Sequence, residues 1–231
     1  MDLENKCLDF GLFTNHPEAM QNFYGGELGL TFQGTAPMGP KFKLSRYQLN
    51  GSVLKLWHAT DPLAARASAG YKTLTVADQK AGGPRTVSDP DGNKLTFVPS
   101  GHNQVDQIEF QVGVSDVALA ERFYGEQLGA ERIASGRYRF GKTILTLSAD
   151  PNAHRVKTEA LGNPLEALAA MAGVGFRYLT IQVRDCAAEY ERLMAMDINR
   201  GVGLARPGGA LVAVFMVRDP DGNWVEILQR P

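Results

Sequence analysis

The chain repeats itself, and this repeat constrains the fold more than any other feature of its 231 residues. Residues 22–29 read NFYGGELG and residues 122–129 read RFYGEQLG, so five of eight positions are identical at an offset of 100. The sequence DPDGN also occurs twice, at 89–93 and 219–223. Each half of the chain therefore has an FYG segment first and a DPDGN turn last, which indicates a duplicated architecture.

Local patterns predict the same elements around each motif. Apolar and polar residues alternate over 8–12 and 108–114, which is typical of half-buried strands. A helix is expected after each strand, begun by His16-Pro17 in one case and capped by Asp116 in the other. Glycines 25, 29, 125 and 129 are expected to stop these helices, and three strand-like runs follow each one.

Two further units complete the pattern. One unit begins with a strand predicted at 178–183, followed by a helix at 187–196 that Asp185 caps. Further strands, one of them over 211–217, run to residue 229. The matching unit of the first half begins at 71–76, but its helix is nearly absent. The segment 160–171 predicts a helix that either packs on the core or forms a lid or wall over the second half of the molecule. The chain thus reads as four βαβββ units, the second one trimmed, with a seam near 101–104.

Composition excludes several classes of protein. Twenty-four basic and 25 acidic residues leave a net charge of −1, so no global basic field favours nucleic acid or an anionic membrane. No apolar run approaches the roughly 18 residues of a spanning helix, and no apolar signal core follows the charged start. Two cysteines are too few for a disulfide framework. We therefore expect a cytoplasmic protein without a nucleic-acid or membrane partner, and open sheet edges favour a homodimer.

The two repeated motifs, in this order, resemble the vicinal oxygen chelate superfamily, which includes glyoxalase I, bleomycin-resistance proteins and extradiol dioxygenases. The resemblance covers about Leu8 to Gln229. It implies an α+β fold whose four βαβββ units pair into two open-cup domains. We expect these domains at 1–100 and 101–231, with the ligand cup in the second. A fold of this kind hosts many chemistries, so the function must be argued from the site.

The resemblance also implies where site residues stand. Metal ligands in that family come from the first strand of a unit, usually as histidine, and from its last strand, usually as glutamate. No histidine stands at such a position here. An oxygen-only set suits hard ions such as Mg²⁺ or Mn²⁺, and the candidate ligands for a divalent metal, whether Mn, Mg or Fe, are Glu109 and Glu226. The corresponding positions are Asp9, Lys55, Tyr71 and Thr96 in the first half and Glu109, Tyr178 and Glu226 in the second.

Two kinds of chemistry stay open for these residues. If Glu109 and Glu226 converge, one carboxyl pKa rises and that group becomes a general acid or base, with Tyr178 as proton donor or oxyanion stabiliser. Alternatively, a divalent ion neutralises both carboxylates and chelates two adjacent substrate oxygens. In the first half, Asp9 and Lys55 are expected to form an ion pair that seals its cup.

Three functions follow from the resemblance. The first is an enzyme of the dioxygenase, lyase or isomerase type, acting on an aromatic diol or a hydroxy- or dicarbonyl compound through Glu109, Tyr178 and Glu226. The second is a metal-free protein that binds a drug or metabolite, as in the bleomycin-resistance branch. The missing histidines favour the second, whereas the retained Glu226 favours the first. The third is a protein that serves only as an interaction scaffold. The polar side chains that line one face of the predicted strands argue against this hypothesis.

Overall fold

The chain folds into the four successive units that the sequence predicts. The computed structural model describes residues 1–67, 69–157, 159–207 and 212–231. Unit 1 contains β1 (Asp9–Thr14), α1 (Pro17–Gln21), η1 (Asn22–Glu27), β2 (Thr31–Pro37), β3 (Phe42–Leu49) and β4 (Ser52–Ala59). Unit 2 contains β5 (Gly70–Ala77), β6 (Arg85–Ser88) and β7 (Lys94–Val98). Unit 3 contains β8 (Ile108–Val114), α2 (Val117–Glu121), η2 (Arg122–Gln127), β9 (Glu131–Ala134), β10 (Arg137–Phe140) and β11 (Thr143–Ala149). After α3 (Pro164–Met171), unit 4 contains β12 (Gly175–Gln182), α4 (Cys186–Met194), β13 (Asn199–Ala205), β14 (Ala213–Arg218) and β15 (Trp224–Gln229).

The predicted caps and the trimmed second unit are confirmed. The carboxylates of Asp116 and Asp185 accept hydrogen bonds from backbone N–H groups in the first turns of α2 and α4. Residues 78–84, which follow β5, are turns and loop rather than helix. Both DPDGN segments connect antiparallel strands, β6 with β7 and β14 with β15. Leu211, the expected start of one strand, lies outside the described residues.

The two FYG segments form π-helices, which the sequence pattern does not predict. The N–H of Leu28 donates to the carbonyl of Phe23, five residues back, at 2.9 Å, and residues 123–128 repeat this bond. Both helices continue through Gly25 and Gly125, so the expected stop at these two glycines is wrong. A Cβ on Gly125 would lie 2.6 Å from the Tyr138 ring, so this glycine permits close packing instead.

The repeated motifs are bonded to each other. The buried hydroxyl of Tyr24, from the first FYG segment, donates to Asp89 of the first DPDGN turn at 2.8 Å. Tyr124 donates to Asp219 in the same way at 3.0 Å. Each aspartate also accepts backbone N–H groups of its own turn. The motifs recur together because each half uses them to join a helix to a hairpin.

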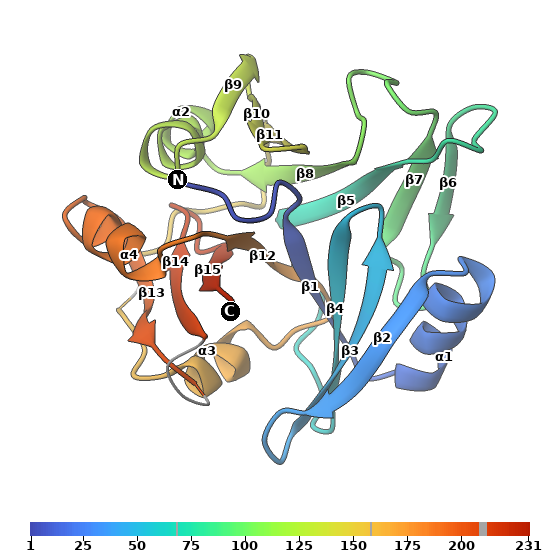
Figure 1. The fold of residues 1–231 in the computed structure, drawn as a ribbon, viewed down its shortest axis with the longest axis horizontal. Helices are drawn as coiled ribbons and strands as arrows, with labels where there is room; N and C mark the ends of the chain where they lie inside the picture. The colour runs from blue at the N-terminus through green and yellow to red at the C-terminus, as the bar shows by residue number, and fades with distance from the viewer. Residues whose placement is uncertain (68, 158, 208–211) are drawn as a thin grey trace.

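The strands form two sheets, each with contributions from both halves of the chain (Figure 1). The first sheet has the order β13-β14-β15-β12-β1-β4-β3-β2 and the second has the order β6-β7-β5-β8-β11-β10-β9. At the centre of the first sheet β1 pairs with β12, and at the centre of the second β5 pairs with β8. Unit 1 therefore shares a sheet with unit 4, and unit 2 shares one with unit 3.

This pairing differs from the expectation that the halves 1–100 and 101–231 each build a cup of their own. Hydrophobic alternation defines a strand's faces but carries no information on which strand lies beside it. The Tyr24–Asp89 and Tyr124–Asp219 bonds still connect the two units within each half. Each half thus holds together through its helix and hairpin, while its strands pair with the other half.

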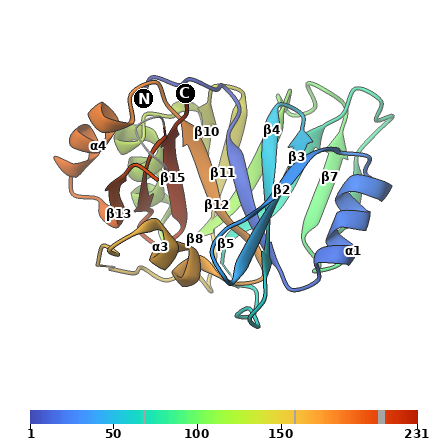
Figure 2. The ribbon, with the colours of Figure 1, turned by 60° about the horizontal axis from the view of Figure 1, so that its bottom comes forward.

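The main core lies between the two sheets. Phe10 of β1, Phe110 of β8 and Phe176 of β12 form an edge-on aromatic cluster with centroid distances of 5.1 to 5.9 Å. Figure 2 shows β5 and β8 running behind β12, with α1 and α4 at opposite ends of the molecule. The first sheet buries a second, smaller cluster on its other face, which includes Trp57, Tyr178 and Met216. None of the described helices is long and apolar enough to cross a membrane.

Candidate functional site

The second apolar cluster surrounds a group of polar side chains on the concave face of the first sheet. Lys55 lies on β4, Tyr178 and Thr180 on β12, and Glu226 on β15, where it is in register with Thr180. Alternation along these strands points all four toward the same face. Tyr178 is opposite Gly11 of β1, and a Cβ at Gly11 would lie 1.8 Å from its ring. Glycine at this position therefore lets the tyrosine lie flat across β1.

A buried ion pair forms the floor of this face. The ammonium of Lys55 contacts Oε2 of Glu226 and donates to Oγ1 of Thr180 at 2.7 Å. Thr180 in turn donates to Oε2 of Glu226 at 2.6 Å. The side chains of Lys55 and Glu226 are only 6% and 17% exposed. Burial acts to raise the pKa of Glu226, but the charge of Lys55 and the two hydrogen bonds outweigh it and lower the pKa.

Asp9 does not form the ion pair with Lys55 that the sequence predicts. Its carboxylate accepts hydrogen bonds from the backbone N–H of Val53 at 2.8 Å and from the Gln182 amide at 2.7 Å. Complete burial raises the pKa of Asp9, against the charge of Lys55. The lysine pairs with Glu226 of unit 4 because β1 places β4 and β12 on its two sides.

Aromatic side chains line one wall of the site. The indole N–H of Trp57 donates to the hydroxyl of Tyr178 at 2.8 Å, and Phe13 stacks on the Trp57 ring. Burial, reinforced by the charge of Glu226, raises the pKa of Tyr178 well above its ordinary value. Tyr178 is therefore a neutral phenol whose position is held by the indole.

An apolar cavity of about 680 Å³ opens over this floor. Helix α3 forms one side of it and also packs in the apolar cluster, but the cavity lies over the sheet of units 1 and 4 rather than over a cup of the C-terminal half. The cavity combines sulfur-containing and aromatic side chains with few polar groups, as is common for small-molecule sites. Its lining includes Met38, Trp57, Leu168, Met171, Tyr178, Met216, Glu226 and Leu228.

Glu109 lies elsewhere. It belongs to β8 of the second sheet, where its Oε1 accepts hydrogen bonds from Arg137 Nε at 2.9 Å and from Thr146. The expected convergence of Glu109 with Glu226 is therefore absent, because the strands that carry them lie in different sheets. Thr96, another predicted position, also lies on the second sheet and is hydrogen-bonded to Thr86.

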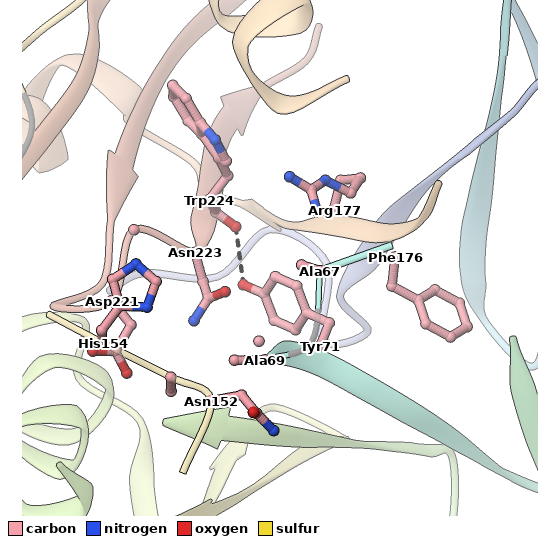
Figure 3. A pocket seen from close by; sticks show the side chains of 13 residues that line it. Ala67, Ala69, Tyr71, Asn152, His154, Phe176, Arg177, Asp221, Asn223 and Trp224 are labelled. Atoms are coloured by element: carbon pink, nitrogen blue, oxygen red, sulfur yellow. Dashed lines mark hydrogen bonds between the residues drawn. The ribbon is translucent and has the colours of Figure 1, made fainter. Parts of the chain in front are cut away.

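Tyr71 lies between the sheets rather than in a cup. Its hydroxyl donates to the backbone carbonyl of Trp224 at 2.9 Å, and its ring packs edge-on against Phe110. Figure 3 shows it beside Asn223 at a small cavity of about 310 Å³, next to the second DPDGN turn. This arrangement gives Tyr71 a role in joining β5 to β15.

The cavity and its polar floor, formed by units 1 and 4, are called the cup below. The side chains of the cup that could act as ligands do not fit a metal ion. The family positions that meet there are Asp9, Lys55, Tyr178 and Glu226. An ammonium already compensates the Glu226 carboxylate, and Asp9 is committed to Val53 and Gln182. Across the described ranges no group of three or more His, Cys, Asp or Glu side chains could hold an ion.

Sequence reasoning missed Thr180 and Trp57. Thr180 lies two residues after Tyr178 on the same face of β12, so alternation could have indicated it once the strand was assigned. Trp57 lies two residues after Lys55 on β4 in the same way, but only the pairing of units 1 and 4 brings it to Tyr178.

Comparisons with known proteins agree with this architecture. A family model described as the Glyoxalase/Bleomycin resistance protein/Dioxygenase superfamily matches residues 104–227, more than half of the chain. A glyoxalase I mutant from Zea mays has a similar structure, with a TM-score of 0.70, 12% identity, and coverage of 96% of this chain and 92% of that one. A predicted dioxygenase from Bacillus subtilis has a TM-score of 0.66 at 13% identity, with coverage of 100% and 86%. At these identities the likeness shows the fold alone. No curated protein sequence matches the chain.

Proposed function

The chain belongs to the Glyoxalase/Bleomycin resistance protein/Dioxygenase superfamily, and on this premise we propose that it binds a small, largely apolar molecule in the cup of units 1 and 4 without a metal ion. The observation that carries the proposal is the apolar cavity of about 680 Å³ above the Lys55–Glu226 pair. A cavity of this size accepts a molecule of one or two rings.

The floor supplies recognition of polar groups on the ligand. Glu226 lines the cavity and accepts hydrogen bonds, while Lys55, buried beneath it, holds the carboxylate in place, so a hydroxyl group of the ligand can be matched. The pair as a whole is neutral, which favours a neutral ligand over an ion. The three methionines of the lining, Met38, Met171 and Met216, have flexible side chains that adapt to ligands of different shape.

Lys55 supports the metal-free form of the proposal. The resemblance implies a glutamate at the last strand of a unit, and unit 1 has Lys55 there, in contact with the glutamate of unit 4. A divalent ion next to Glu226 would meet the ammonium as a like charge. Lys55 thus supplies the positive charge that a metal would otherwise supply.

Catalysis at the same floor is the second candidate. The observation that favours it is a carboxylate and an ammonium side by side in a desolvated site, because the first can accept a proton and the second can stabilise an oxyanion. Its substrate would be a hydroxy- or dicarbonyl compound or an aromatic diol. Turnover of such a compound, lost in Glu226→Gln while binding is retained, would distinguish an enzyme from a binding protein.

Ligand-observed NMR with catechol and a panel of small aromatic and hydroxycarbonyl compounds tests the proposal. We expect at least one compound to bind and Leu168→Trp, which fills the cavity, to abolish binding. Glu109→Gln, on the other sheet, serves as the control and should bind normally. Elemental analysis of the purified protein should find no stoichiometric metal. Metal that is present and lost in Glu226→Ala would contradict the proposal.

A further inference from the structure

We infer that a second cavity, lined by Arg218 and separate from the cup, binds the phosphate group of a small phosphorylated molecule. This Arg218 cavity has a volume of about 390 Å³ and shares no lining residue with the cup. It lies beside the second DPDGN turn. Its lining is Phe123, Gln127, Arg155, Val156, Lys157, Asp197, Ile198, Asn199, Arg218 and Pro220.

Arg218 is a buried cation without a counter-charge. The residue is 9% exposed, and its guanidinium lies 3.8 Å from the centroid of the Trp224 ring. Its Nε is buried without a hydrogen-bond partner, and no carboxylate of the described residues forms an ion pair with it. Burial lowers the pKa of Arg218. Because buried charges are normally paired, the missing partner is expected to come from a ligand.

Two more cations face the same cavity. Arg155 and Lys157 are exposed residues of the connection between β11 and α3, and Asp197 is the one carboxylate in the lining. The lining therefore has two net positive charges, which match the charge of a phosphate monoester near neutral pH.

The segment that carries these cations is fixed in place. The N–H of Val156, between them, donates to the carbonyl of Pro220 at 2.9 Å. The amide of Asn199 donates to the carbonyls of Val156 and Asp219 at 3.0 and 3.1 Å. These bonds fix the backbone between Arg155 and Lys157 at the second DPDGN turn before any ligand arrives, which lowers the entropic cost of binding.

The corresponding hairpin of unit 2 shows that the turn does not need this arginine. Ser88 precedes the first DPDGN segment where Arg218 precedes the second, and Lys94 stands where Trp224 stands. Both Ser88 and Lys94 are exposed. The stacked Arg218–Trp224 pair is therefore particular to unit 4. A guanidinium that stacks by its face keeps its edge N–H groups for bidentate contact with phosphate oxygens.

Titration of the full-length protein with inorganic phosphate and phenyl phosphate, followed by 31P NMR and by calorimetry at constant ionic strength, tests the inference. We expect saturable binding that is weaker by about tenfold or more in Arg218→Met, which keeps the packing on Trp224. Lys80→Gln, which removes an exposed cation in the loop between β5 and β6, should bind normally.

A second variant keeps the test valid if Arg218→Met fails to fold. Arg155→Gln/Lys157→Gln changes only exposed side chains, and we expect severalfold weaker binding with a smaller salt dependence. Absence of saturable binding by the wild type, or unchanged binding in both variants, would overturn the inference. Loss of phosphate binding in Glu226→Gln would also overturn it, since that result would place the anion in the cup. Failure of the cup proposal leaves these outcomes unaffected.

Discussion

On the first sheet the pair Lys55 and Glu226 lies under an apolar cavity, whereas on the second sheet the pair Arg137 and Glu109 lies among threonines. Both sheets join two units through antiparallel central strands. Both also carry a carboxylate bonded to a cation and a threonine. The surroundings of the pairs differ: Met216 and Leu228 near Glu226 are buried, while Thr73 and Thr146 on the second sheet are not.

The connections between units explain this difference. Residues 150–174 join unit 3 to unit 4 and contain α3, which lies over the first sheet and closes its cavity (Figure 1). The described residues between β4 and β5 contain no helix. Duplication thus supplies two similar sheets, and a longer connection covers a cavity on one of them.

The largest expected effect comes from removing the cation of the cup. Lys55→Met leaves the Glu226 carboxylate uncompensated in an apolar site, so we expect a loss of about 3–5 kcal/mol in the free energy of unfolding. Urea denaturation at neutral pH measures it. Arg137→Met, on the second sheet, should cost clearly less because polar hydroxyl groups surround Glu109.

The double variant Lys55→Met/Glu226→Leu sharpens this prediction. Replacing both charges by apolar groups removes the uncompensated carboxylate, so most of the lost stability should return. A double variant as unstable as Lys55→Met would show that the lysine acts through its packing, and the contrast between the two sheets would fail.

The repeated motifs should show similar effects in the two halves. Tyr24→Phe and Tyr124→Phe each remove the hydrogen bond to a buried aspartate, and we expect a loss of about 1–2 kcal/mol in each case, with Tyr124→Phe at the upper end because its hydroxyl also meets that of Tyr71. Thermal or urea unfolding measures both. Neither variant should alter binding in the cup, because these tyrosines join helices to hairpins on the other side of the sheets. A large difference between the two would contradict their equivalence.

The pH dependence of the free energy of unfolding should distinguish the carboxyl groups of Asp219 and Glu226. Burial raises the pKa of Asp219 to about 6 from 3.8, whereas Lys55 lowers the pKa of Glu226 below 4.5. The stabilising contribution of Asp219 is therefore complete below pH 3.8 and is lost as the pH rises through about 6. The contribution of Glu226 is present above pH 4.5 and is lost as the pH falls below that value. Carboxyl 13C NMR titration measures both, and a Glu226 carboxyl that titrates above 4.5 would contradict the ion pair.

The sequence predicts the four units because repeated motifs and alternation are local signals. It also predicts that Glu226 faces a cup, since Trp224 and Leu228 flank the glutamate on the same side of β15, and the structure places Glu226 and Tyr178 at one cavity. It does not predict that Lys55 reaches Glu226, because that contact depends on which units share a sheet. The expected convergence of Glu109 with Glu226 fails for the same reason: the two lie in the same half of the chain but in different sheets.

A methyl NMR spectrum of the protein labelled with 13C at the methionine methyl groups tests the central claim most directly. Met38, Met171 and Met216 line the cup, while Met20 and Met194 contact the core between the sheets. On addition of a compound found in the ligand panel, such as catechol, the first three signals should shift and the last two should stay in place. Shifts confined to Met20 and Met194, or no shift of the three cup methionines at saturation, would contradict binding in the cup of units 1 and 4.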